Sequence, residues 1–66
     1  MKRNRLKGMI LYRDMTEPEI AEKLGISRRA MANRMAGRVE FTVGEIMHLV
    51  KILRLTAPEI NYIFDI

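Results

Sequence analysis

The sequence predicts a small all-α domain made of five helices. Apolar residues recur at three- and four-residue spacing through most of the chain, which is the periodicity of an amphipathic helix. A threonine-led motif, T-x-x-E, stands before three of these apolar stretches, where it is typical of a helix start. The 66 residues are enough for one domain and no more, so we assign residues 1–66 to a single domain.

The helix starts are the most specific local signals. In a T-x-x-E capping box the threonine hydroxyl accepts a hydrogen bond from the N–H three residues later, and the glutamate accepts one from the threonine N–H. Ser27 is a further cap, without an acidic partner. The first helix has no cap and is predicted from apolar spacing alone. Capping boxes begin at Thr16, Thr42 and Thr56. The helices are expected over 4–13, 17–24, 28–36, 43–54 and 57–64.

The link between the second and third helices predicts a tight helix-turn-helix. Gly25 directly follows the second helix, and glycine adopts the left-handed conformation that ends many helices. Ile26 is expected to fill the angle between the two helices. The small side chain of Ala21 would let the third helix cross close to the second.

The positive charge is concentrated in one half of the chain. Residues 1–38 contain ten Lys and Arg and four acidic residues, a net charge of +6, whereas residues 39–66 have a net charge of −2. An excess of basic charge in one half is typical of a domain that binds a polyanion. The alternative interpretation is a solvated charged surface without a partner.

Several function classes are excluded by composition. The chain has no cysteine and one histidine, His48, so we expect no disulfide, metal or cofactor. Nothing pairs His48 with a nucleophile, and no glycine-rich phosphate loop is present, so we expect neither enzymatic activity nor a small-molecule substrate. No apolar run is long enough to span a bilayer. We therefore expect a cytoplasmic protein with no membrane partner.

The segment T-E-P-E-I-A-E-K-L-G-I-S-R-R-A-M-A-N-R-M-A-G-R, over residues 16–38, resembles the Cro/CI-type (XRE-like) helix-turn-helix family of phage repressors and related transcriptional regulators. The likeness continues through E-F-T-V-G-E-I and I-L-R-L-T-A-P-E-I and covers approximately residues 6–64. The resemblance implies a lambda-repressor-like DNA-binding domain in a bacterial cell. It also implies that the third helix lies in the major groove of double-stranded DNA.

A helical wheel of the third helix separates apolar from polar side chains. Met31 and Met35 face one side. Arg29 and Asn33 face the other, and Arg28 lies at the start of the helix. Arginine matches the acceptors of guanine and asparagine matches adenine. Arg28, Arg29 and Asn33 are therefore the expected base-contacting residues.

Phosphate contacts are expected from groups around the third helix. Arg34 borders the core, so its stem would lie on apolar surface while the guanidinium reaches a phosphate. Glu17 replaces a glutamine that is common in the family and would either orient Arg28 or favour the positive end of its own helix. The expected phosphate-contacting residues are Thr16, Lys23, Arg34, Arg38 and Thr42. A flexible arm or a solubilising segment is expected from Lys2, Arg3, Arg5 and Lys7.

Apolar residues outside the helix-turn-helix are expected to complete the core. Val39 and Phe41 would close it beneath the link to the fourth helix. The flexible thioether side chain of methionine suits it to filling irregular space in a core. All six methionines are expected to fill the core, and four of them have neighbours at helical spacing: Met9, Met31, Met35 and Met47.

The C-terminal segment is unusually apolar. One helix face cannot bury all five apolar residues of 60–66, so a remaining exposed patch is expected. We expect Tyr62, Ile63 and Ile66 to form a homodimer interface, which would impose a near-palindromic operator. The alternatives are an intramolecular lid and a surface that covers a second domain.

Two functions fit the sequence. The first is a sequence-specific DNA-binding transcriptional regulator. The second is a protein-interaction module of the same fold, such as an antitoxin or antirepressor. DNA binding would depend steeply on salt and be lost after combined substitution of Arg29 and Asn33 by alanine. Binding to a protein would show neither effect.

Overall fold

Five helices and no strand make up the computed structural model, which describes residues 1–66. The predicted all-α class is therefore confirmed, and every helix begins and ends within two residues of its expected bounds. The helices are α1 (Arg3–Tyr12), α2 (Glu17–Leu24), α3 (Arg28–Met35), α4 (Val43–Ile52) and α5 (Ala57–Phe64).

The predicted caps form at the starts of α2 to α5. Thr42 Oγ1 accepts a hydrogen bond from the Glu45 N–H at 3.1 Å, and the Glu45 carboxylate accepts one from the Thr42 N–H at 3.0 Å. The capping boxes at Thr16 and Thr56 contain the same two bonds. Ser27 accepts from the N–H three residues later at 3.0 Å. These bonds satisfy N–H groups that have no intrahelical partner, so each one defines a helix start.

The turn between α2 and α3 has the expected conformation. Gly25 ends α2 with a φ of 75°, in the left-handed region. Ile26 is half-buried and packs against the hydrophobic core. Ala21 is only 1% exposed, and α2 packs against both α3 and α4. The small side chain thus lies where α2 is covered by its neighbours.

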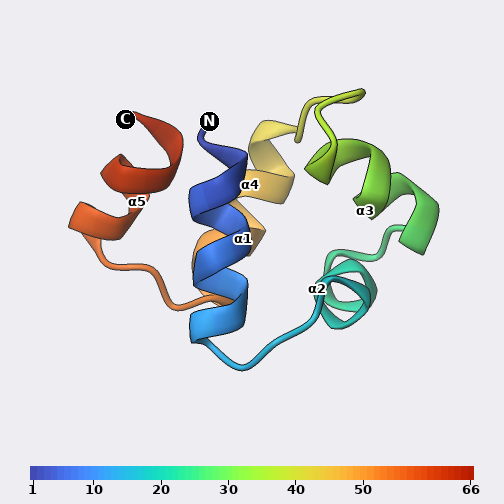
Figure 1. Cartoon of the computed structure of the whole chain (residues 1–66), viewed down its shortest axis with the longest axis horizontal. Coiled ribbons are helices and arrows are strands. Elements are labelled where there is room, and N and C mark those ends of the chain that lie inside the picture. The colour runs from blue at the N-terminus through green and yellow to red at the C-terminus, as the bar shows by residue number, and fades with distance from the viewer.

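The helices are arranged around α1, which lies at the front of the view in Figure 1 with α4 behind it. α5 lies on one side of α1 and packs against it, and the α2–α3 pair lies on the other side (Figure 1). The two chain ends lie together, because the Lys2 N–H donates to the Ile63 carbonyl at 2.7 Å. None of the helices is both long and apolar enough to cross a membrane.

The hydrophobic core draws on all five helices. Phe41 closes it as predicted and is 6% exposed. The predictions for Val39 and Met47 are wrong, because both side chains are exposed. The chain bends at residues 38–39 and turns Val39 away, while Met47 lies on the outer face of α4. The eleven buried residues are Leu6, Ile10, Ile20, Ala21, Met31, Phe41, Leu49, Leu53, Leu55, Ile63 and Phe64.

Three arginines in or next to α1 bind the C-terminal ends of three other helices. The acceptors are carbonyls at helix ends, where the helix dipole places partial negative charge and few carbonyls have intrahelical partners. The bonds join Arg3 Nε to Arg34 O (2.9 Å), Arg5 Nη1 to Tyr62 O (2.9 Å) and Arg13 Nε to Leu53 O (2.8 Å). The expectation of a flexible basic arm is therefore wrong for Arg3 and Arg5, which belong to α1 and hold it to its neighbours.

Candidate nucleic-acid interface

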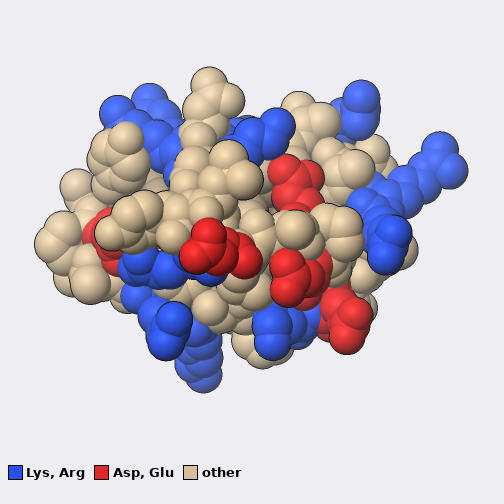
Figure 2. Space-filling view, turned by 60° about the horizontal axis from the view of Figure 1, so that its bottom comes forward, with Lys and Arg blue, Asp and Glu red and all other residues tan.

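The first turn of α3 presents two arginines to solvent. Arg28 and Arg29 are exposed, whereas Met31 is buried on the opposite side of the helix. Neither arginine takes part in any of the three ion pairs of the structure. Basic side chains project from the end of the molecule that α2 and α3 form (Figure 2). Both guanidinium groups are thus available to an external acceptor.

Asn33 lies one turn further along α3 and is linked to Arg38. Arg38 Nη1 donates to Asn33 Oδ1 at 3.3 Å, and the Arg38 N–H donates to the Asn33 carbonyl at 2.9 Å. The structure therefore brings together a residue expected to contact bases and one expected to contact phosphate. An amide oxygen has two lone pairs, so Asn33 Oδ1 keeps the capacity to accept a second hydrogen bond.

Arg34 is placed differently from the other arginines of α3. Its Nε and Nη2 donate to the two carboxylate oxygens of Glu45 at 2.8 and 3.2 Å, and its Nη1 donates to the Ala30 carbonyl at 3.2 Å. The two charged side chains are only 16% and 15% exposed. All three nitrogens of the guanidinium are therefore engaged inside the protein. We leave Arg34 out of the candidate interface, although the sequence placed it there.

The Arg34–Glu45 pair ties the end of α3 to the start of α4. The hydrogen bonds from Arg34 are the largest influence on the pKa of Glu45, which lies below its ordinary value. Burial opposes this shift, and the bond from the Thr42 N–H adds to it. Glu45 is therefore charged at neutral pH and serves both as the acidic member of the α4 capping box and as the ion-pair partner of Arg34 in α3.

The two threonines expected at phosphates have other partners in the structure. Thr16 Oγ1 accepts from the Glu19 N–H and donates to the Glu19 carboxylate at 3.0 Å. Thr42 makes the equivalent capping bond to the N–H of Glu45. Both threonines are exposed, but a phosphate that approached either one would meet a carboxylate. Lys23 is exposed, and its side chain has no carboxylate partner.

The structure distinguishes between the two roles considered for Glu17. No ion pair or hydrogen bond joins Glu17 to Arg28, and Glu17 lies in the first turn of α2. An acidic residue is stabilising at that position because the helix N-terminus carries partial positive charge. The role in orienting Arg28 is therefore not seen.

The C-terminal surface is smaller than predicted. Ile63 is fully buried within the protein, so its assignment to a dimer interface is wrong. Tyr62 and Ile66 are 51% and 76% exposed and remain candidates. The guanidinium of Arg5 lies 4.2 Å from the centre of the Tyr62 ring, a distance at which cation–π attraction holds the ring in place.

The contacts of Arg3 next to α3 were not predicted from the sequence. Its partners, Arg34 and Glu40, are 31 and 37 positions away. No local motif marks such a pair, because only the folded chain brings the Arg3 side chain to the end of α3.

The fold and this surface define a small basic all-α domain in which one helix presents unpaired arginines. No group of three or more His, Cys, Asp and Glu side chains is arranged to hold a metal ion. Comparisons with protein-family models, curated proteins and solved structures find no match to this chain.

Proposed function

We propose that the protein is a sequence-specific DNA-binding transcriptional regulator of the Cro/CI type, with α2, its turn and α3 as a helix-turn-helix. The observation that carries this proposal is the division of the arginines. Arg3, Arg5, Arg13 and Arg34 are bound within the protein, while Arg28 and Arg29 have no acidic partner and lie together on α3. Two arginines without an acidic partner thus lie on the helix that the sequence resemblance assigns to the major groove, while Arg38 and Arg54, which are also exposed and have no ion pair, lie outside the helices.

The side chains of α3 suit the edges of base pairs. Arg28 and Arg29 would donate to O6 and N7 of guanine, and Asn33 would pair with N6 and N7 of adenine. Arg38 and Lys23, which come after and before α3 in the chain, would contact phosphates. Base contacts of this kind discriminate by about 1–3 kcal/mol each, which supports sequence specificity.

A homodimer is part of the proposal. The exposed Tyr62 and Ile66 lie at the C-terminal end, and a two-fold contact through them would present two α3 helices to one duplex. The half-sites of a near-palindromic operator would then be about 34 Å apart. Bound across a promoter, such a dimer would repress transcription by excluding the polymerase.

The alternative function is a protein-interaction module of antitoxin or antirepressor type. The exposed Tyr12, Tyr62 and Ile66 favour it, because exposed apolar side chains often mark protein contacts. This function requires neither the free arginines of α3 nor a strong dependence on salt. The two proposals therefore differ in two measurable properties, the need for the arginines of α3 and the dependence of binding on salt.

The decisive experiment is selection of bound duplexes from a random pool at two salt concentrations. DNA binding predicts an enriched, near-palindromic sequence and an affinity that falls with salt with a slope of about −0.9 per phosphate contact. Recovery of no preferred sequence, with binding insensitive to salt, would refute the proposal.

Variants of three residues separate base contacts from phosphate contacts. Asn33→Ala should relax the preference at one base position, at a cost of about 1–3 kcal/mol. Arg38→Ala should weaken binding to all duplexes alike and make the salt slope less steep by about 1. Lys51→Ala is the matched control, because this exposed lysine near the end of α4 carries the same charge but lies outside the interface.

A further inference from the structure

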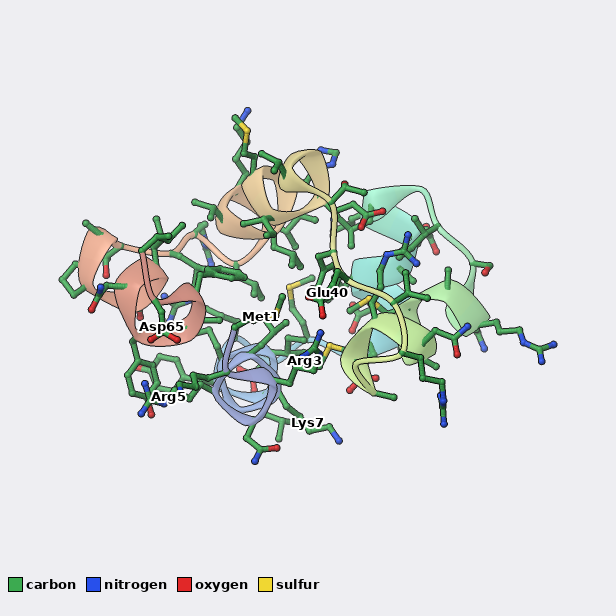
Figure 3. All side chains as sticks on the ribbon, turned by 90° about the horizontal axis from the view of Figure 1, so that it is seen from above. Met1, Arg3, Arg5, Lys7, Glu40 and Asp65 are labelled. Atoms are coloured by element: carbon green, nitrogen blue, oxygen red, sulfur yellow. The ribbon has the colours of Figure 1, made fainter.

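The segment that leaves α3 is contacted at three points by one side chain of α1. Arg3 Nε donates to the Arg34 carbonyl at 2.9 Å, and Arg3 Nη2 donates to Glu40 Oε1 at 3.1 Å. Between these two residues, the same guanidinium lies against Gly37, where an added Cβ would be 3.3 Å from Arg3 Cζ. In Figure 3 Arg3 points from α1 towards Glu40, while Arg5 leaves the helix on the other side.

Two residues of the proposed DNA interface are connected to this segment: Arg38 lies within it, and Asn33 of α3 is hydrogen-bonded to it. The Asn33 carbonyl accepts hydrogen bonds from the N–H groups of Arg38 and Val39 at 2.9 and 3.4 Å. Arg38 in turn donates from its side chain to that of Asn33. The orientation of both side chains therefore depends on the path of the backbone from residue 34 to residue 40, which is the part that Arg3 contacts.

The first turn of α1, which carries Arg3, is itself hydrogen-bonded to α5. The Lys2 N–H donates to the Ile63 carbonyl at 2.7 Å, and Arg5 donates to the Tyr62 carbonyl at 2.9 Å. The first turn of α1 is thus attached to the end of α5 on one side and to the end of α3 on the other. Gly37, with a φ of 82°, permits both the turn and the close approach of the guanidinium.

We propose that Arg3 is a positioning residue, which contributes to DNA specificity by holding the C-terminal end of α3 and the segment after it without touching DNA. The inference rests on the proposed function. Arg3 has a half-buried side chain whose donors already point at protein acceptors, so an unspecific charge effect is the weaker explanation. Hydrogen bonds of an ionised donor are stronger than neutral ones, which suits this holding role.

The test compares Arg3→Ala with Lys2→Ala. Both variants lose one positive charge at the same end of the protein, but the exposed Lys2 side chain makes none of these contacts. The first measurement is amide hydrogen exchange of Gly37 and Arg38 in the free protein. Arg3→Ala should speed exchange at these two amides about tenfold relative to the amides of α3, whereas Lys2→Ala should leave the exchange rate unchanged.

The second measurement is the ratio of affinity for the selected duplex to affinity for a random duplex. Arg3→Ala should lower this ratio about tenfold, and Lys2→Ala should weaken both affinities equally. Glu40→Gln is the second variant, since it removes the negative charge of one exposed partner of Arg3, keeps an acceptor oxygen and is compatible with folding. It should change both measurements in the same direction by a smaller amount.

Three results are distinguishable. Unchanged exchange at Gly37 and Arg38 in Arg3→Ala would overturn the inference, as would equal ratios for Arg3→Ala and Lys2→Ala. If no duplex is selected by the wild-type protein, the proposed function itself fails, and the role of Arg3 in DNA specificity falls with it. In that case a changed exchange rate would still show that Arg3 holds this segment.

Discussion

Replacing Arg34 by alanine should destabilise the fold rather than remove a phosphate contact. The substitution deletes two hydrogen bonds to Glu45, of 2.8 and 3.2 Å, and one to the Ala30 carbonyl. A hydrogen bond to a charged group contributes about 1.5–3 kcal/mol when shielded from water. Glu45 keeps its bond from Thr42 and retains 15% exposure, so solvent screening reduces the expected loss to about 2 kcal/mol. For a domain of this size, that loss lowers Tm by about 8–16 °C.

The stability lost in Arg34→Ala should depend on pH, because the ion pair requires a charged Glu45. The pKa of Glu45 is lowered in the folded protein, so its contribution to stability is present above the ordinary glutamate pKa of about 4.3. This contribution disappears as the pH falls through the pKa that Glu45 has in the folded protein. Below that pH the Glu45 carboxyl is neutral in both the wild type and Arg34→Ala. The difference in Tm between wild type and Arg34→Ala should therefore be largest near neutral pH and shrink in acid.

Thermal unfolding followed by circular dichroism over a range of pH measures both effects. Arg38→Ala is the matched control, because it removes an exposed arginine with no ion pair and should change stability by less than about 0.5 kcal/mol. Equal Tm values for wild type and Arg34→Ala, or a difference that is the same at neutral and acidic pH, would refute the reasoning.

Three further predictions concern stability. Gly8→Ala should stabilise the fold by about 0.5–1 kcal/mol, whereas Gly25→Ala should destabilise it by about 1–2 kcal/mol. At both positions the new Cβ meets no atom within 4 Å, but only Gly25 has a left-handed φ, which is strained for alanine. Urea titration measures the free energy of unfolding of both variants, and a change of the same sign in the two would contradict this account. Leu49→Ala should cost about 2–5 kcal/mol because Leu49 is fully buried, and Met47→Ala, at an exposed site on the same helix, should cost little; equal urea midpoints for the pair would refute the core assignment. Glu59→Gln should make stability less sensitive to acid, because the bond from the Thr56 N–H, aided by Arg13, lowers the pKa of Glu59 and its contribution is lost as the pH falls; an unchanged pH profile of Tm would exclude this role.

The local structure was determined by local interactions, which is why the sequence alone predicts it. A capping box joins residues three apart, and apolar spacing defines the buried face of a single helix. The positions of the helices to within two residues, the left-handed Gly25 and the burial of Met31 all follow from such short-range patterns and are confirmed. The exposure of Arg28 and Arg29 follows from the same wheel argument and is confirmed in the structure.

Long-range pairing was decided only by the tertiary structure. The sequence predicts a phosphate contact for both Arg34 and Arg38, but the folded chain places Glu45 of α4 beside Arg34 and leaves Arg38 exposed. Likewise, the basic residues at the start of the chain carry no sign of which carbonyls they bind. The energy of an ion pair depends on the distance and shielding of the two charges, and both are properties of the folded chain. The sequence therefore determined which helices form, and the tertiary packing decided which arginines remain free to bind a partner.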